Sequence, residues 1–369
     1  MNPVSLASGN VYEPMQVSET TWELLESDYP NGEFRDVSFV NETHGWIVGK
    51  ETSSFSSDAI VLFTDDGGDS WHVQYNRSSE YFKNMDIIEE RIIWVTGSSG
   101  NLFYTLDCGN SWNESNVMGA IGGMSTVKFI NRTHGWTASN GVLYGTTDCG
   151  QTWTNVSGWT FSSDLPRMMQ VLSPQDIWAS GYSGIYHSAD GGESWEQSSN
   201  RGGWALSFVS DTEGWVVDDN RLAYTSDGDT WEEQIIPMRA PFFRLNPPYA
   251  SDIQFVDESN GWIVGDEIKV MYTSDGGMNW YEQSVPNAVD RRVMALDFIN
   301  GTHGWAVGYG GTIMRTRTGN TLGSRLWKGV TDPLFLSIVG VVAVVTIVTV
   351  GGIVKLKMRK SKSKSVEIQ

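Results

Sequence analysis

The chain has 369 residues, a length that a single closed all-β domain can hold. Its net charge is −19, and residues 355–369 contribute +5, so residues 1–354 carry −24. This acidic body repels nucleic acid, which excludes nucleic-acid binding as a function. Seventeen Trp and forty Gly predict many short strands joined by tight turns, and two Cys are too few for a disulfide framework.

Residues 1–18 form a polar N-terminal segment, and residues 19–321 contain two alternating motifs. The first motif is an apolar strand and a turn that lead into a Trp, as in FVNETHGWIVG at Trp46. It occurs seven times, and successive Trp residues are 48, 42, 42, 37, 47 and 43 positions apart. Because this is the length of a four-stranded propeller blade, we expect an all-β, seven-bladed β-propeller. The strands of blade 1 are expected at about 35–41, 45–50, 59–65 and 71–76.

The second motif, Ser/Thr-x-Asp-x-Gly-x-Ser/Thr/Asn-Trp, is an Asp box, and the copy ending at Trp231 is one residue short. Its Asp is expected to accept turn N–H groups, and its Trp to pack between blades. A calcium loop is the alternative, but a motif repeated in nearly every blade favours a structural role. The Asp and Trp of the six copies are Asp66 and Trp71, Asp107 and Trp112, Asp148 and Trp153, Asp190 and Trp195, Asp227 and Trp231, and Asp275 and Trp280.

The seventh Asp box, TRTGNT at 316–321, lacks both its Asp and its Trp. The segment ETTWELLES around Trp22 resembles the strands that follow the complete Asp boxes. We therefore expect residues 21–27 to complete blade 7 and to close the ring, which removes an open sheet edge.

The GW-x-VG and T-x-DGG-x-S/T-W patterns together resemble the photosystem II stability and assembly factor family of seven-bladed propellers, built from bacterial neuraminidase repeats. The resemblance covers about residues 20–321 and implies a binding protein with arginine patches, without a cofactor. Sialidase-like glycosidases share the Asp box, but they need convergent carboxylates, an arginine cluster and a tyrosine nucleophile. Their Arg-Ile-Pro signature is absent near the first blade, and the sequence identifies no second catalytic group to act with Asp218 and Asp219, which lie in an upper loop. We expect no catalytic residues, with a sialidase-like glycoside hydrolase as the alternative.

The four strands of each blade are here called A to D in chain order, from the inner to the outer edge. The A–B turns and the Asp-box turns share one face of a propeller, here called the bottom, and the remaining loops share the top. The long loops 49–58 and 236–250 lie at the top, where variable loops favour a binding site. Cations and aromatic residues gather at the starts of the inner strands and in loop 236–250, which predicts a basic, aromatic mouth. Its expected ligand is a protein or peptide with anionic groups, or a glycan. The candidate residues are Arg35, Lys83, Arg167, Arg201, Trp204, Arg239, Phe242, Phe243, Arg244, Arg291 and Arg292.

An alternative is that these cations pair with acidic neighbours and hold the mouth together. The acidic neighbours are Glu33, Asp36, Asp164, Asp252 and Asp290. The three histidines of the THGW turns, His44, His134 and His303, occupy one repeat position in different blades, so we expect no metal site. Cys108 and Cys149 also share a repeat position, and adjacent blades hold them too far apart for a disulfide.

Residues 334–354 are uncharged and long enough to cross a bilayer as a single helix. After the linker 322–333, this helix is expected to anchor the propeller, with the basic tail 355–369 in the cytoplasm and the propeller outside. No signal peptide is visible. Three explanations stay open: an upstream start, another export signal, or a tail-anchored protein with a cytosolic propeller.

Six Asn-x-Ser/Thr sequons predict a glycoprotein, and five of them fall at the bottom face or its rim. The exception is Asn76. The six residues are Asn41, Asn76, Asn113, Asn131, Asn155 and Asn300.

Overall fold

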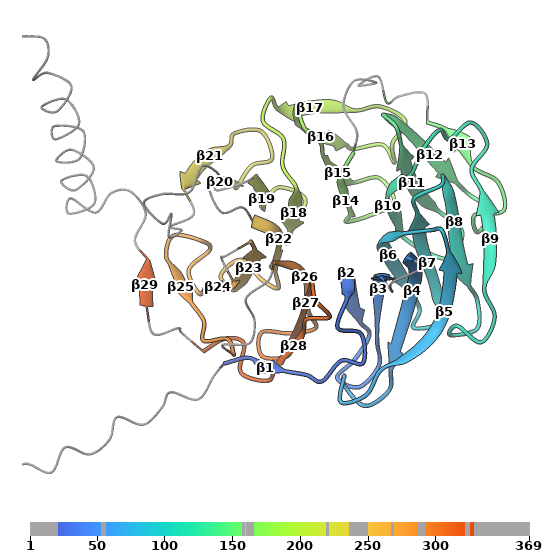
Figure 1. The fold of residues 1–369 in the computed structure, drawn as a ribbon. Helices are drawn as coiled ribbons and strands as arrows, with labels where there is room; N and C mark the ends of the chain where they lie inside the picture. The colour runs from blue at the N-terminus through green and yellow to red at the C-terminus, as the bar shows by residue number, and fades with distance from the viewer. Residues whose placement is uncertain are drawn as a thin grey trace, which may run out of the picture. The chain divides into compact units, whose positions relative to one another are not determined.

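The computed structural model describes residues 21–52, 57–156, 159, 166–218, 221–235, 250–266, 269–286, 292–321 and 325–327. Within these ranges the strands form seven antiparallel sheets. Each sheet is one blade, and the seven blades surround a common centre (Figure 1). The expected all-β, seven-bladed propeller is confirmed.

The blades have the following strands, given from the inner to the outer edge. Blade 1 comprises β2 (Gly32–Phe39), β3 (Gly45–Thr52), β4 (Ser57–Thr64) and β5 (His72–Ser78). Blade 2 comprises β6 (Phe82–Ile88), β7 (Ile92–Gly97), β8 (Asn101–Thr105) and β9 (Asn113–Asn116). Blade 3 comprises β10 (Met124–Phe129), β11 (Gly135–Ser139), β12 (Val142–Thr146) and β13 (Thr154–Asn155). Blade 4 comprises β14 (Met168–Val171), β15 (Ile177–Ser180), β16 (Ile185–Ser188) and β17 (Glu196–Ser199).

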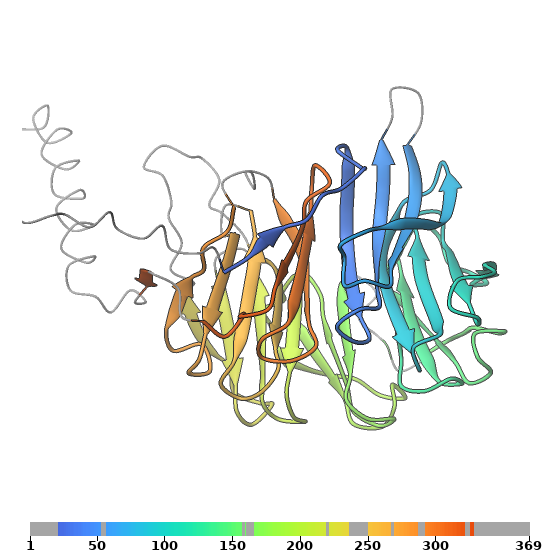
Figure 2. The same ribbon diagram turned by 90° about the horizontal axis from the view of Figure 1, so that it is seen from below.

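The last three blades complete the ring. Blade 5 comprises β18 (Ala205–Phe208), β19 (Gly214–Asp218), β20 (Arg221–Thr225) and β21 (Glu232–Ile235). Blade 6 comprises β22 (Ala250–Phe255), β23 (Gly261–Gly265), β24 (Lys269–Thr273), β25 (Trp280–Glu282) and β29 (Arg325–Trp327). Blade 7 comprises β26 (Val293–Phe298), β27 (Gly304–Gly308), β28 (Ile313–Thr316) and β1 (Glu23–Leu24). Figure 2 shows the blades side-on, with the connections gathered at the two faces.

The N-terminal strand closes the ring, as the repeat pattern predicts. Strand β1 pairs antiparallel with β28, with Glu23 opposite Arg315 and Leu24 opposite Met314. Trp22 is completely buried, and its indole N–H donates a hydrogen bond to Gln283 Oε1 at 2.8 Å. The outer edge of blade 7 is therefore built from the first described residues of the chain.

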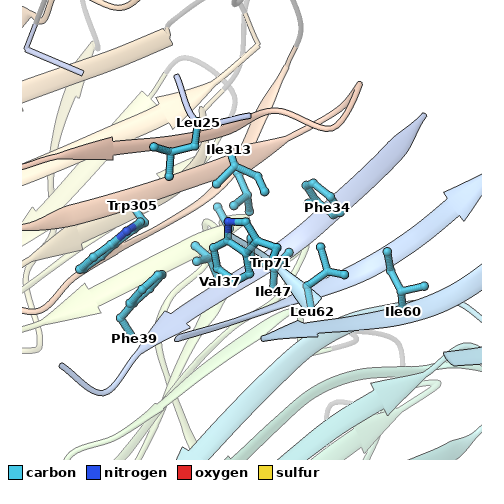
Figure 3. Close-up of a cluster of buried hydrophobic side chains, with 12 residues drawn as sticks. Leu25, Phe34, Val37, Phe39, Ile47, Ile60, Leu62, Trp71, Trp305 and Ile313 are labelled. Carbon is cyan, nitrogen blue, oxygen red and sulfur yellow. The ribbon is translucent and has the colours of Figure 1, made fainter. Parts of the chain in front are cut away.

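A repeated aromatic contact joins neighbouring blades. Trp305 of blade 7 stacks on Phe39 of blade 1 with ring centroids 3.5 Å apart, and Trp71 meets Phe39 edge to face (Figure 3). The same stack joins Trp215 to Phe255 and recurs at three other boundaries. Each such pair adds about 0.5–1.5 kcal/mol beyond the area that it buries. The Trp and Phe residues of the first motif thus hold adjacent blades together.

The Asp boxes form turns that their own side chains stabilise. Asp66 accepts hydrogen bonds from the backbone N–H of Ser70 at 2.9 Å and from the hydroxyls of Ser70 and Thr64 at 2.7 Å. Burial raises the pKa of Asp66, but these hydrogen bonds outweigh it and hold the pKa at about 2. Asp227 makes the corresponding bonds in the shorter copy. The Asp of this motif has a structural role in the turn.

The A–B turns explain three of the six sequons. Asn41 Oδ1 accepts hydrogen bonds from the backbone N–H groups of Thr43 and His44 and from the Thr43 hydroxyl, each at 2.9 Å. Asn131 and Asn300 make the same contacts in blades 3 and 7. The Asn-x-Thr pattern is therefore what this turn requires, and the use of the sequons stays a prediction.

Part of the expected linker 322–333 belongs to the propeller. Residues 325–327 form β29, which pairs antiparallel with β25, so that Trp327 lies opposite Trp280. The reason is that β25 would otherwise present an open edge with unpaired backbone groups. The segments 1–18, 334–354 and 355–369 lie outside the described residues, and none of the described residues forms a helix that is long and apolar enough to span a membrane.

Candidate ligand-binding cavity

The inner strands of five blades share a local irregularity near their starts. The register with the neighbouring strand shifts in β2, β6, β10, β22 and β26. A bulge of this kind inserts an extra residue and redirects its side chain. The residues at these shifts line one cavity at the top face: they are Arg35, Lys83, Asn84, Ser125, Ser251 and Met294.

The cavity has a volume of about 620 Å³. It brings together five of the predicted ligand-binding residues: Arg35, Lys83, Arg167, Trp204 and Arg292. Two of the acidic neighbours named above, Asp36 and Asp252, also line it. The other lining residues were not among the candidates from the sequence: Tyr81, Asn84, Ser125, Met168, Tyr182, Ser251, Met294 and Ala295. Tyr81 lies two residues before Lys83 in the sequence. This nearness to the start of an inner strand is the one sequence feature that could have marked Tyr81 as a cavity residue.

Arg35 is held between two aromatic rings on one side of the cavity. Its guanidinium carbon lies 5.1 Å from the ring centre of Tyr81 and 5.0 Å from that of Tyr309. It also forms an ion pair with Glu33 at 3.6 Å, and Lys50 binds the same carboxylate at 3.3 Å. The Arg35–Glu33 ion pair is the kind of contact expected under the alternative in which the cations pair with acidic neighbours and hold the mouth together. Glu33 therefore offsets part of the positive charge of Arg35.

Arg167 lies between the aromatic rings of blades 4 and 5. Its guanidinium carbon is 3.1 Å from the ring centre of Tyr182 and 3.4 Å from that of Trp204. Tyr182 is 70% exposed and Trp204 is 40% exposed, so both rings face the solvent at the mouth. The contacts fix the planar guanidinium at the cavity wall, in an arrangement suited to bidentate recognition of a carboxylate.

The two acids of the cavity contribute less negative charge than their number suggests. Burial raises the pKa of Asp36 to about 6 and that of Asp252 to about 7. Their oxygens accept backbone N–H groups of the next blade: Asp36 from Met85 at 2.9 Å, and Asp252 from Leu296 at 3.0 Å. Near neutral pH a fraction of these carboxyl groups is protonated. The cavity is also lined by four basic residues, Arg35, Lys83, Arg167 and Arg292, so its net charge is positive.

The cations also perturb one another. Burial lowers the pKa of Lys83, and the nearby charge of Arg35 lowers it further. Arg292 donates a hydrogen bond from Nε to Ser251 Oγ at 3.1 Å, which links the starts of blades 6 and 7 at the cavity. Positive charges held close together favour a bound anion.

Further along the inner strands, a ring of polar side chains accepts hydrogen bonds from backbone N–H groups of the next blade. Asp297 accepts a hydrogen bond from Phe39 N at 2.6 Å, and Asp86 accepts one from Phe129 N at 2.7 Å. Lys128 forms an ion pair with Asp86 at 3.2 Å. Gln170 and Gln254 make equivalent contacts, so this ring of side chains is a structural layer beneath the cavity.

The remaining predicted residues lie elsewhere. Arg201 does not line the cavity, because it forms an ion pair with Glu233 on the outer strand of blade 5. Arg239, Phe242, Phe243, Arg244 and Arg291 lie outside the described residues, as do Asp164, Asp219 and Asp290. Among the residues that the structure describes, no group of three or more His, Cys, Asp or Glu side chains could hold a metal ion, and Cys108 and Cys149 are both free.

The arrangement of motifs agrees with the comparison to known families. The model of the Photosynthesis system II assembly factor YCF48 family matches residues 14–156 and 244–354, which together are more than half of the chain. The chain belongs to this family. Among curated relatives, the photosystem II stability/assembly factor HCF136 of Arabidopsis thaliana is 22% identical, over 85% of this chain and 83% of its own length.

Solved structures of low identity show the same fold. A structure described as YCF48 bound to D1 peptide has a TM-score of 0.66 at 19% identity, covering 82% of this chain and 98% of that one. YCF48 from Cyanidioschyzon merolae has a TM-score of 0.61 at 16% identity, covering 80% and 98%. A xyloglucanase from Xanthomonas campestris has a TM-score of 0.59 at 11% identity, covering 83% and 55%. Because the family is one of assembly factors, the chain is a binding protein, and the glycosidase alternative is not favoured.

Proposed function

We propose that this chain is an assembly-factor-like propeller whose cavity binds a carboxylate-bearing segment of a partner protein. The observation that carries the proposal is that Arg35, Lys83, Arg167 and Arg292 line one cavity in a body of charge −24. A local reversal of charge focuses the field on an anionic ligand, and arginine forks recognise carboxylates in particular. The YCF48 structure that holds a D1 peptide supports a polypeptide as the ligand class.

The test is a charge reversal in the cavity, with a matched reversal on the opposite face. The variant Arg35→Glu, Arg167→Glu, Arg292→Glu is compared with Arg91→Glu, Arg132→Glu, Arg317→Glu, which changes the net charge equally at exposed positions of the bottom face. Binding of the full chain is measured at low and high salt on an array of peptides from the proteins of its own cell, beside a glycan array.

We expect the cavity variant to lose at least about tenfold in peptide affinity, because it loses charge-assisted hydrogen bonds, while the bottom-face control keeps it. Wild-type affinity should also fall as salt is raised. Equal affinities of the two variants, or binding to glycans alone, would overturn the proposal.

We also propose that residues 334–354 anchor the propeller in a membrane, with residues 355–369 in the cytoplasm. The uncharged stretch and the basic residues that follow it support this orientation. Protease treatment of intact cells should remove the propeller and leave the tail. Protection of residues 1–333 would show that the propeller lies inside.

A further inference from the structure

The connection between β9 and β10, residues 117–123, holds apolar side chains in the solvent. Met118 is 87% exposed and Ile121 is 74% exposed. The loop is nevertheless fixed at both ends, because Val117 is buried between blades 2 and 3 and Ser139 Oγ donates a hydrogen bond to Gly122 O at 3.1 Å. Apolar side chains presented by a fixed loop are typical of an interaction surface.

This loop borders the cavity at Lys83. A Cβ atom placed on Gly123 would lie 3.2 Å from Lys83 Nζ and 2.9 Å from Ser98 O. The close approach leaves no room for a side chain between the loop and the ammonium group. The apolar loop and the basic wall formed by blades 1 and 2 are therefore contiguous.

Two buried polar atoms of that wall have no hydrogen-bond partner among the described residues. Arg35 Nε and Tyr81 Oη are buried, and neither has a hydrogen-bond partner in the described part of the chain. Both residues line the cavity. Buried polar groups without partners are rare in folded proteins, so these two atoms are candidate donors for a ligand in the cavity, which a small turn of either side chain would expose to it.

We propose that Arg35, Tyr81 and Lys83 form a subsite that binds a carboxylate, and that Met118 and Ile121 form an apolar subsite next to it. The partner segment is then a peptide that carries a carboxylate next to a bulky aliphatic side chain. The inference rests on the proposed function and narrows it to blades 1 and 2. Arg167, between the rings of blades 4 and 5, serves a different part of the ligand. The carboxylate belongs either to an acidic side chain or to the free C-terminus of the partner.

The position of the carboxylate subsite in a cavity favours a peptide over a lipid surface. Arg35, Tyr81 and Lys83 line a cavity of about 620 Å³, which one side chain or chain end of a peptide can enter and a flat bilayer cannot. A bilayer would contact Met118 and Ile121 without reaching these residues.

The experiment uses the full chain and an array of octapeptides. Each peptide carries Leu or Ser beside one of four groups: Asp, Asn, a free C-terminus or an amidated C-terminus. The protein variants are Tyr81→Phe, the pair Met118→Ser and Ile121→Ser, and the control Met278→Ser, which removes a 77% exposed Met from an Asp-box turn at the bottom face. Tyr81→Phe keeps the ring over Arg35 and removes a hydroxyl without a partner, so folding stability should not fall.

Wild-type protein should bind peptides with both a carboxylate and Leu at least about tenfold more tightly than those lacking either one. Tyr81→Phe should weaken binding to the carboxylate peptides about tenfold, and the Met118/Ile121 pair should abolish only the preference for Leu over Ser. Met278→Ser should change neither. The Asp and free C-terminus peptides tell the two carboxylate sources apart.

Three outcomes would overturn the subsite assignment: no preference for Leu, unchanged binding by Tyr81→Phe, or binding only to vesicles of anionic phospholipid that depends on Met118 and Ile121. If the triple charge reversal abolishes peptide binding while Tyr81→Phe and the loop variant do not, the proposed function stands and this assignment fails. If the triple reversal has no effect, the proposed function fails as well.

Discussion

Trp22 meets the ring of Phe298 edge to face, with centroids 5.7 Å apart and an interplanar angle of 87°. In blades 1, 3, 5 and 6 the Asp-box Trp contacts the inner-strand Phe of its own blade in the same way. Trp22 therefore fills the position that the incomplete Asp box of blade 7 leaves without a Trp. The two ends of the propeller are joined by the same contact that packs the other blades.

Replacing Trp22 with Ala should destabilise the whole propeller by about 3–5 kcal/mol, because it removes a completely buried indole. Urea unfolding followed by tryptophan fluorescence measures the change. Trp204→Ala is the control, since this side chain is 40% exposed and its loss should cost less than about 1 kcal/mol. Similar losses in the two variants would mean that Trp22 does not close the ring.

Arg315 also joins the first and last strands of the propeller. Its own side chain is buried, whereas the carboxylates that it binds are exposed. It is 4% exposed, donates to Gly67 O at 2.9 Å, and lies 2.9 Å from Glu23 and 2.8 Å from Asp69. Arg315→Met should cost about 2–3 kcal/mol in the free energy of unfolding. Glu23→Gln should cost less than about 1 kcal/mol, because that carboxylate is 57% exposed. Thermal denaturation of both variants checks this order, and a larger loss for Glu23→Gln would contradict it.

Two Asp boxes carry backbone strain that glycine would relieve. Cys108 and Cys149 have φ values of 61° and 62°, whereas the equivalent Gly67 and Gly191 have 78° and 77°. Non-glycine residues are disfavoured in this left-handed region. Cys108→Gly and Cys149→Gly should each stabilise the protein by about 0.5–1 kcal/mol, the gain being reduced by the greater freedom of glycine in the unfolded chain. Gly67→Cys should have the opposite sign, and calorimetry of the three variants tests both directions.

Stability should fall as pH rises from about 4 to 7. Burial raises the pKa of Asp36 and Asp297 to about 6 and that of Asp252 to about 7, from an ordinary value of 3.8. The folded protein then binds protons more tightly than the unfolded chain in this window, so acid favours folding. Asp66 acts in the opposite sense, because its pKa of about 2 gives stability that is lost only below pH 4.

The melting temperature should therefore be highest near pH 4–5. The variant Asp252→Asn should show a shallower decline between pH 5 and 7, since it removes the group with the highest of these pKa values. A melting temperature that rises steadily from pH 5 to 7 in the wild type would rule this account out.

The A–B turns should accept Asp in place of Asn. In blade 6, Asp257 Oδ1 accepts the backbone N–H groups of Ser259 and Asn260, the contacts that Asn41 makes in blade 1. Asn41→Asp should therefore leave the melting temperature nearly unchanged, while Asn41→Ala should cost about 1 kcal/mol. Equal effects of the two substitutions would show that the Oδ1 atom does not support the turn.

The sequence by itself determined the fold and indicated the face on which the candidate cavity lies. Seven copies of one motif at blade-length spacing imply a propeller, and the missing Asp-box Trp of blade 7 points to Trp22. The reason is that these signals are local and repeated: equivalent positions in each copy take equivalent places in the ring. The same reasoning placed Arg35, Lys83, Arg167 and Arg292 at the top mouth.

Only the tertiary structure decided which side chains share the cavity. Bulges in the inner strands redirect residues by one position, and although they recur at one repeat position, the strand residues there carry no turn or glycine signal that reveals a register shift. Tyr182 reaches Arg167 across a B–C turn, while Glu233, 32 residues away on an outer strand, binds Arg201. These outcomes depend on the pairing of distant segments, which sequence spacing within one repeat does not encode.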